Sequence, residues 1–189
     1  MTKKEIRKQY LAARIQLPKD TCTSHTEAIL RHFRKLSFPN IRYFLSYYPL
    51  TDRNEFDVEH CEKYLTNIFP DAKCCWPIMK ASGNEMEART VDKDRMFVKN
   101  QYNILEPLHG DPVDAGSIDL VFVPLLAFDL QGYRIGYGKG FYDRFLKTCR
   151  KDVMTIGFSF FDPVDKIDDL SEFDVPLMLC ITPTRVYEF

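Results

Sequence analysis

Residues 118–124 form an almost continuous apolar run, and a loop rich in glycine follows them. A strand that is apolar on both faces has to be buried on both faces, which is the situation of a strand inside a parallel sheet covered by helices. A run of this kind cannot lie at a solvent-exposed surface. It therefore constrains the fold more than any other segment of the chain.

Hydrophobic spacing predicts strands and helices in alternation along the chain. Helices are predicted at residues 3–16, 24–36 and 55–69, and a further one after the glycine-rich loop, with Phe141, Phe145 and Cys149 on one face. Strands are predicted at residues 41–47, 73–78, 86–91, 95–99, 118–124, 153–158 and, as the last, 178–182. A predicted turn at residues 81–84 makes the region around it a small antiparallel hairpin region. The sequence thus predicts an α/β, three-layer, Rossmann-like fold, in which a mostly parallel central sheet carries helices on both faces.

Length and charge restrict the class of protein. The 189 residues suit a single domain, 1–189, and the balance of 26 basic and 27 acidic residues gives no overall attraction to nucleic acid or to an anionic membrane. No apolar run is long enough to span a bilayer, and no apolar signal segment follows the charged start, so we expect a cytoplasmic protein. The six cysteines lack metal-binding spacing and are expected to be reduced. A monomer is expected.

The glycine-rich loop is the first candidate for a binding site. It carries Gly132, Gly136, Gly138 and Gly140 together with the basic residues Arg134 and Lys139. Glycine lets backbone N–H groups approach a ligand closely, and a loop that opens a helix favours an anion such as phosphate. The spacing matches neither a P-loop nor the dinucleotide fingerprint. From composition alone, a glycine-rich connection between strand and helix with no ligand is therefore nearly as good an interpretation as a phosphate site.

Residues 119–144 resemble the central signature of the 5-formyltetrahydrofolate cyclo-ligase family, also called 5,10-methenyltetrahydrofolate synthetases. The matching residues are Asp119, Pro124, Ala127-Phe128-Asp129, Gly132, Arg134-Ile135-Gly136, Gly138, Gly140 and Phe141-Tyr142-Asp143-Arg144. Ile135 and Phe141 are conservative differences from leucine and tyrosine. The resemblance extends to a Lys-x-x-x-Arg element in the first helix, to Glu55, to Ile-Leu-Glu-Pro at 104–107 and to Ile-Thr-Pro at 181–183.

The resemblance implies a reaction in which ATP drives the cyclisation of 5-formyltetrahydrofolate, with or without additional glutamates, to 5,10-methenyltetrahydrofolate, releasing ADP and phosphate. In the family mechanism the formyl oxygen is phosphorylated, and N10 then attacks the activated carbon. Such chemistry depends mainly on positioning and on neutralising phosphate charge. The expected partners are accordingly ATP, Mg²⁺ and the folate.

The resemblance also implies residue roles at the nucleotide. The ATP-binding residues would be Lys3, Lys4, Arg7, Arg134, Gly136, Tyr137, Gly138, Lys139, Gly140, Phe141 and Tyr142, with Lys139, Arg134 and Tyr142 catalytic and Lys139 the principal cation at the transition state. Simpler readings remain open. The first helix could present a solvated basic face, Arg7 could form a surface ion pair, and Lys139 could be a solvated loop lysine. Tyr142 could either stack on a ring or bind a phosphate.

The folate and metal positions follow in the same way. Substrate-binding residues would be Leu45, Glu55, Tyr137, Lys139 and Phe141, and the metal ligands would be Asp143 and Asp174. A carboxylate can accept the adjacent N–H groups of a pterin, which suits Glu55. Alternatively, Glu55 and Asp143 could be acids in the first turn of a helix, and Leu45 could be a core residue. Asp129 is interpreted as a structural turn residue, and none of the four histidines is given a catalytic role.

One position departs from the family pattern, and two rival functions stay open. Phe173 stands where many members have a histidine before the aspartate that corresponds to Asp174. A similar α/β sheet could support another ATP-using or sugar-phosphate enzyme, because fold does not fix function. A non-catalytic nucleotide-binding or regulatory module is the rival from a different class. An enzyme is favoured over such a module by the joint presence of the phosphate, pterin and metal positions, namely Lys139, Arg134, Glu55, Asp143 and Asp174.

Overall fold

The structure is a computed structural model that describes residues 1–80, 85–91, 96–101 and 104–189. The predicted turn at residues 81–84 and the first residue of the predicted strand 95–99 lie outside this part of the chain. All six cysteines are free thiols. Within the described ranges, no helix combines the length and the apolar character needed to cross a bilayer.

The element order alternates helices and strands much as the sequence predicts. The helices are α1 (Lys3–Ile15), α2 (Lys19–Phe33), α3 (Glu59–Ile68) and α4 (Phe141–Leu146), with short 3-10 turns η1 (Thr51–Arg53) and η2 (Ala115–Ser117). The strands are β1 (Tyr43–Leu45), β2 (Lys73–Met79), β3 (Met86–Thr90), β4 (Phe97–Lys99), β5 (Leu105–Pro107), β6 (Asp111–Val113), β7 (Leu120–Val123), β8 (Ala127–Phe128), β9 (Arg134–Ile135), β10 (Met154–Phe158), β11 (Leu179–Ile181) and β12 (Val186–Glu188).

The main sheet has the order β12-β11-β10-β7-β1-β2-β3-β6. Its central strands β11, β10, β7, β1 and β2 are parallel, whereas β12 at one edge and β3 and β6 at the other run antiparallel. The parallel strands follow the doubly wound order 2-1-3-4-5, in which the direction of winding reverses between β1 and β7. Ligands of such sheets bind beyond the carboxyl ends of the strands at this reversal.

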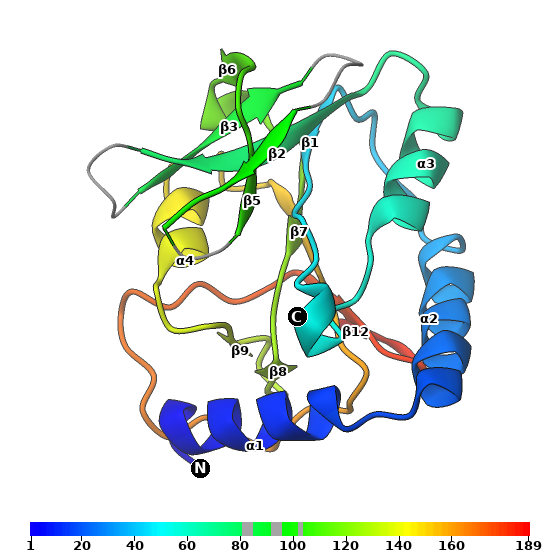
Figure 1. Cartoon of the computed structure of the whole chain (residues 1–189), viewed down its shortest axis with the longest axis vertical. Coiled ribbons are helices and arrows are strands. Elements are labelled where there is room, and N and C mark those ends of the chain that lie inside the picture. Colours follow the sequence, from blue (N-terminus) through cyan, green and yellow to red (C-terminus); the bar gives the residue numbers. More distant parts are fainter. Residues whose placement is uncertain (81–84, 92–95, 102–103) are drawn as a thin grey trace.

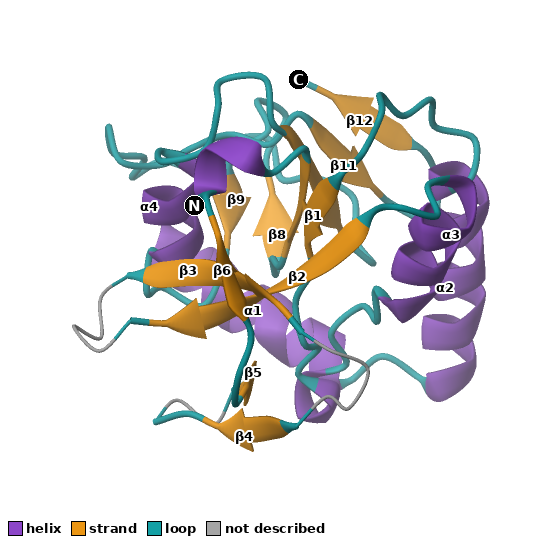
Figure 2. Cartoon of the chain, turned by 90° about the horizontal axis from the view of Figure 1, so that it is seen from above, coloured by secondary structure: helices purple, strands orange, loops and turns teal. Residues whose placement is uncertain are grey.

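Helices cover both faces of the sheet, as predicted. Figures 1 and 2 show α2 and α3 on one side of it and α4 on the other. Along β7, the side chain of Phe122 packs in the cluster that includes Phe33 of α2, and that of Val121 packs in the cluster that includes Phe145 of α4. Successive side chains of a strand point to opposite faces. This double burial explains why residues 118–124 are almost uniformly apolar.

Helix α1 lies across one end of the sheet, outside the two helical layers (Figure 1). A capping box starts it, because the Thr2 side chain accepts the Glu5 backbone N–H and the Glu5 carboxylate accepts the Thr2 N–H. On its apolar side, Ile6 is fully buried against Ile135 and Ile167. The apolar stripe thus fixes the rotation of α1 and decides which of its basic residues face the protein.

Several boundaries differ from the predictions. Helix α2 begins earlier, at Lys19, directly after Pro18, which cannot donate a backbone hydrogen bond. Helix α3 begins later, at Glu59, and α4 ends at Leu146, so that Cys149 packs beside it in the same cluster without being part of it. The prediction that residues 178–182 form the last strand is wrong. The chain turns back after Thr182, where Thr182 N–H bonds the carbonyl of Arg185, and β12 pairs antiparallel with β11.

The hairpin prediction is confirmed for β2 and β3, which pair antiparallel. The next strand, β4, does not extend that hairpin but pairs with β5 in a separate small ribbon (Figure 2). The sequence also gave no indication of β6 or of the short β8–β9 pair. Such strands of two or three residues are too short for an alternating pattern to reveal.

A buried carboxylate joins the first and third strands of the parallel set. Asp119, at 3% exposure, precedes β7 and accepts the backbone N–H groups of Arg42 (2.6 Å) and Tyr43 (3.0 Å) and a 2.7 Å bond from Arg150. Partial burial alone would raise the pKa of the Asp119 carboxyl, but these donors outweigh it and hold the pKa below its usual range. Asp119 therefore aligns β1 with β7 at the end of the strands opposite to the site.

We expect Asp119→Ala to lower the free energy of unfolding at neutral pH by about 2–3 kcal/mol, because two backbone N–H groups and a guanidinium lose their acceptor. Since the folded pKa is depressed, the contribution is present above the unfolded pKa and is lost as pH falls through the folded pKa. Urea unfolding at pH 7 and pH 3 should show a smaller difference from wild type at the lower pH. The matched control is Asp152→Ala, an exposed partner of Arg150. An equal effect of both variants would contradict the assignment.

Candidate active site

A cavity of about 810 Å³ lies where the winding of the sheet reverses. Tyr47 and Tyr48, which follow β1, and Pro124, which follows β7, line it. Its other walls come from α1, the loop around η1, β2, β3, the β4–β5 ribbon, the glycine-rich loop, α4 and residues 171–174. This volume is within the range of small-molecule sites. The position agrees with the rule for doubly wound sheets.

Helix α1 contributes basic side chains to one wall. Lys3 and Arg7 line the cavity and are half-buried, so the reading of α1 as a simple solvated face is wrong for them. Lys4 is exposed and lies outside the lining, although the family resemblance included it among the ATP-binding residues. The difference follows from geometry, because residues four and seven apart share a helix face while adjacent residues do not.

The glycine-rich loop depends on conformations that other residues rarely adopt. Gly138 and Gly140 have φ of +86° and +68°, which is the left-handed region. A Cβ at Gly138 would lie 3.1 Å from the guanidinium carbon of Arg7. Arg7 also donates from Nε to the Gly136 carbonyl at 2.9 Å. Arg7 therefore packs directly on the loop, and the contact is with backbone rather than with a surface carboxylate.

The remaining loop residues that were predicted to bind ATP also reach the cavity. Lys139, Tyr137 and Phe141 all line it. The backbone carbonyl of Lys139 accepts a 2.9 Å bond from Arg144, whose guanidinium lies 5.4 Å from the centre of the Phe141 ring. The loop thus places a lysine and an aromatic ring beside the basic wall of α1.

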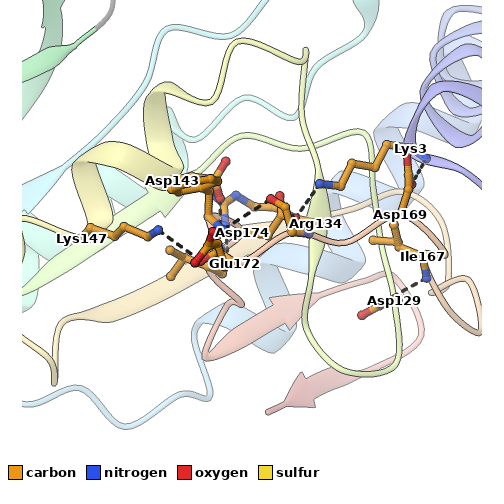
Figure 3. A network of polar contacts seen from close by, with 12 residues as sticks. Lys3, Asp129, Arg134, Asp143, Lys147, Ile167, Asp169, Glu172 and Asp174 are labelled. Atoms are coloured by element: carbon orange, nitrogen blue, oxygen red, sulfur yellow. Dashed lines mark hydrogen bonds and ion pairs between the residues drawn. The ribbon is translucent and has the colours of Figure 1, made fainter.

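Two ion pairs lie side by side in the same wall (Figure 3). Arg134, which is buried, donates to Asp143 at 3.0 Å, and Lys3 contacts Asp174 at 2.5 Å. Burial lowers the pKa of the Arg134 guanidinium, and Asp143 opposes this effect. Partial burial raises the pKa of the Asp174 carboxyl, but the Lys3 ammonium and the Ser171 N–H outweigh it and bring the pKa below its usual range. The Asp174 carboxylate is therefore held as an anion next to the Lys3 ammonium.

Asp143 and Asp174 were predicted as metal ligands, and both line the cavity. Asp143 also occupies the first turn of α4, which agrees with the alternative interpretation of this residue as a helix first-turn acid. No cluster of three or more possible metal ligands occurs among the residues that the structure describes. Mg²⁺ does not need such a cluster, because it often takes one or two carboxylates together with water and substrate phosphate. This donor set fits a magnesium ion that arrives with a nucleotide.

Glu55 lines the cavity beside Tyr137 of the glycine-rich loop and is only 9% exposed. Its oxygens accept the Leu50 N–H at 2.9 Å and the Tyr137 hydroxyl at 2.7 Å. Because α3 begins at Glu59, the interpretation of Glu55 as a helix N-terminal acid is wrong. Burial raises the pKa of the Glu55 carboxyl, and the nearby guanidinium of Arg14 limits the rise. The site therefore holds a carboxylate in a mostly dehydrated position.

The Tyr142 hydroxyl is a buried polar atom without a hydrogen-bond partner among the described residues. Burial raises the pKa of this hydroxyl well above its ordinary value, so it stays protonated. Tyr142 lines the cavity. Because an unpaired buried hydroxyl costs free energy, a polar ligand atom that accepts from it would bind favourably there.

Two further residues take structural positions. Leu45, which the resemblance placed at the substrate, is fully buried in the core and does not line the cavity. This agrees with the alternative interpretation of Leu45 as a core residue. Asp129 accepts the backbone N–H groups of Gln131 and Tyr133 at 3.0 Å each and that of Ile167 at 3.3 Å. The interpretation of Asp129 as a turn residue is therefore confirmed.

The sequence did not reveal two parts of the site. One is an apolar wall formed by β2, β3, the start of β5 and the residue before it. Its residues are Pro77, Ile78, Met79, Met86, Ile104 and Leu105. Apolar residues in strands are core by default, so nothing in the sequence distinguished them. The other is Arg14, which is buried beside Glu55 although charge on a helix usually faces water. Its spacing of seven from Arg7, on the face that carries Lys3, was a signal for it.

Comparisons with known proteins agree on one family. The model of the 5-formyltetrahydrofolate cyclo-ligase family matches residues 1–183. A protein of that name from Mus musculus is 31% identical over 132 residues, which are 66% of this chain and 61% of the mouse protein. One from Escherichia coli K12 is 33% identical over 96 residues, 49% of this chain and 53% of that protein. The matches thus span between half and two thirds of the length of these relatives.

Solved structures are similar over nearly the whole chain. A 5,10-methenyltetrahydrofolate synthetase from Mycoplasma pneumoniae superposes with a TM-score of 0.77 at 24% identity, covering 97% of this chain and 99% of the other. The synthetase from Aquifex aeolicus gives the same TM-score at 27% identity, with 100% and 93% covered. Both agree with the mixed α/β architecture described above.

The left-handed glycine at position 138 provides a test of the loop. We expect Gly138→Ala to lower the free energy of unfolding by about 1–2 kcal/mol, because alanine is strained at this φ and crowds Arg7. Gly136→Ala is the matched control, since a Cβ there meets nothing nearer than 4.0 Å. It should change stability by no more than about 0.5 kcal/mol. Denaturant unfolding measures both, and equal losses would show that the loop conformation is not what matters.

Proposed function

Because the chain belongs to the 5-formyltetrahydrofolate cyclo-ligase family, we propose that it converts 5-formyltetrahydrofolate to 5,10-methenyltetrahydrofolate with consumption of ATP and release of ADP and phosphate. One observation carries the proposal beyond membership of the family. A single cavity joins a basic, glycine-rich wall to a buried carboxylate and an apolar wall. The basic, glycine-rich wall is complementary to a polyphosphate, and the carboxylate with the apolar wall is complementary to a pterin. The reaction requires both ligands at once.

The basic wall is suited to the phosphates of ATP. Lys3, Arg7 and Lys139 converge on it from α1 and from the glycine-rich loop. Phosphoryl transfer needs in-line positioning and cations that stabilise charge on the transferred group, and little covalent participation by the protein. We assign Lys139 as the principal cation at the transferred phosphoryl group, with Arg134 and Tyr142 supporting it. Gly136, Gly138 and Gly140 bring the backbone close enough to bind the phosphates.

The chemical step follows from this arrangement. The formyl oxygen of the folate accepts the γ-phosphoryl group, which turns a poor leaving group into a good one. N10 then bonds to the formyl carbon and loses its proton, and the C–O bond breaks so that the oxygen leaves within inorganic phosphate. The enzyme contributes by holding the two ligands at reacting distance, which replaces an unfavourable bimolecular encounter.

The part of the cavity around Glu55 and the apolar wall is suited to the folate. The Glu55 carboxylate can accept two adjacent N–H groups of the pterin, and a charge-assisted pair of this kind is strong in a buried site. Tyr137 and Phe141 offer ring surfaces beside it. The apolar wall from β2, β3 and the β4–β5 ribbon would contact the less polar part of the ligand. Leu45 supports this wall only from within the core.

Asp143 and Asp174 would hold Mg²⁺, which when bound neutralises phosphate charge. In the structure these carboxylates contact Arg134 and Lys3 instead. Lys3 would then be free to turn from Asp174 toward the nucleotide. A cytoplasmic location, a monomeric state and acceptance of additional glutamates stay predictions from the sequence.

The central prediction is enzymatic. We expect purified protein with 5-formyltetrahydrofolate, Mg²⁺ and ATP to form the near-ultraviolet band of the methenyl product, with no rise without ATP. Lys139→Ala should reduce kcat by about 10²-fold or more, as loss of one preorganised electrostatic group does. Lys151→Ala, an exposed lysine beyond α4, is the control and should keep wild-type turnover.

Two outcomes would redirect the proposal. Folded protein that binds ATP but yields no product would favour an enzyme acting on another substrate or a regulatory module. If Lys139→Ala keeps its kcat and only raises the Michaelis constant for ATP, Lys139 binds ATP but does not stabilise the transition state.

The two walls can be tested separately by binding. We expect Glu55→Gln to weaken 5-formyltetrahydrofolate roughly 10–100-fold, because a neutral amide replaces a charged acceptor, while ATP affinity stays within about twofold. Arg7→Ala should show the opposite selectivity, and Lys8→Ala, exposed on the same helix, should change neither. Calorimetric titration with each ligand alone measures these effects. Equal weakening of both ligands by Glu55→Gln would mean that the residue supports the fold instead.

A further inference from the structure

Arg14 is a buried cation that no part of the mechanism above uses. It is 4% exposed, although it lies near the end of a helix that is otherwise half in water. Its guanidinium donates from Nε to the Arg53 carbonyl at 2.8 Å and from Nη1 to the Leu125 carbonyl at 2.9 Å. The same side chain therefore connects α1 to the η1 loop and to the segment after β7.

The third contact of Arg14 reaches the site. Nη2 donates to the Tyr137 hydroxyl, which in turn donates to Oε1 of Glu55. Nη2 and Oε1 are themselves 3.8 Å apart. A guanidinium remains charged in proteins, so its burial demands an anion nearby, and Glu55 supplies it. Arg14, Tyr137 and Glu55 thus form one connected unit, referred to below as the Arg14 relay.

We propose that Arg14 is a positioning residue of the substrate site, which holds Glu55 ionised and aligned through the Tyr137 hydroxyl. The inference rests on the proposed function, because it assigns Arg14 to the recognition of the pterin. A carboxylate presents only acceptors, whereas a protonated carboxyl presents a donor to the N–H groups of the ligand. Arg14 does not touch the ligand in this scheme. It determines which protonation state and orientation of Glu55 the ligand meets.

The relay predicts a particular dependence on pH. Burial disfavours the charged form of Glu55, and Arg14 is the leading group that favours it. Substrate affinity should fall as pH decreases through the pKa of Glu55, and loss of Arg14 should move that fall to higher pH. The ionisable groups that face Glu55 are Arg14 from α1, Arg53 from η1, Tyr137 from the glycine-rich loop, Tyr47 after β1 and Tyr142 from α4. The tyrosines stay protonated in the working range, so Glu55 is the group that titrates.

The test is the affinity for 5-formyltetrahydrofolate without nucleotide, measured between pH 5 and pH 8.5 for wild type, Arg14→Gln and Arg14→Lys. Arg14→Gln should bind about tenfold more weakly at neutral pH, and its midpoint of lost affinity should lie at higher pH than that of wild type. Arg14→Lys keeps the charge and should restore the midpoint, while the lost hydrogen-bond fork keeps the affinity below wild type. Lys8→Gln, on the exposed face of α1, is the control.

A folded Arg14→Gln variant with the wild-type pH profile would overturn the inference, and so would a profile equally displaced in Arg14→Gln and Arg14→Lys. If Arg14→Gln does not fold, Tyr137→Phe decides, because it removes only the hydroxyl of the relay. That variant should weaken the folate severalfold, and unchanged affinity would refute the relay. Failure of the proposed function is separate, because wild-type protein would then bind no 5-formyltetrahydrofolate at any pH.

Discussion

Strand β7 is enclosed on every side, and this enclosure determines where the site can form. It pairs with β1 and β10 along its edges and packs against α2 and α4 through alternate side chains. Because the winding of the sheet reverses between β1 and β7, the connections that leave these strands diverge. The space between them is left for a ligand. A strand this deeply buried also gives the loop after it a rigid origin, which binding groups on loops require.

Three of the ion pairs among the described residues lie in or beside the site. Arg134 pairs with Asp143 nearby in the chain, whereas Lys3 pairs with Asp174 and Arg14 with Glu55 across segments distant in the sequence. Pairing reduces the free-energy cost of dehydrating these groups before a ligand arrives. Under the proposed function, a polyphosphate would enter by exchanging partners with residues that are already ordered. Preorganisation of this kind lowers the cost of binding.

Much of the architecture could be predicted from the sequence, because it follows from local periodicity. The apolar run at residues 118–124 predicted both its own burial and the covering helices correctly. Strand β12 could not be predicted, because only its pairing with β11 gives so short a segment a role. For the site, the glycine-rich loop and the basic first helix were recognisable. The apolar wall was not, because it depends on which distant segments meet. Arg14 was missed although its spacing from Arg7 places it on the face of Lys3, because only the packed structure shows that this face is buried at Arg14.

Lys3 and Asp174 are separated by 171 positions, and Arg7 and Gly136 by 129. Contacts between residues so far apart in the sequence form late in folding, since the entropic cost of closing a long loop must be overcome first. During synthesis α1 is made before residues 171–174, so the contact between Lys3 and Asp174 cannot form until those residues have been made. A nascent or truncated chain therefore holds the cations of the site without their counterparts and lacks a wall of the cavity. Competence to bind should appear only after residues 171–174 have joined the fold, so copies that lack them should not sequester ligands.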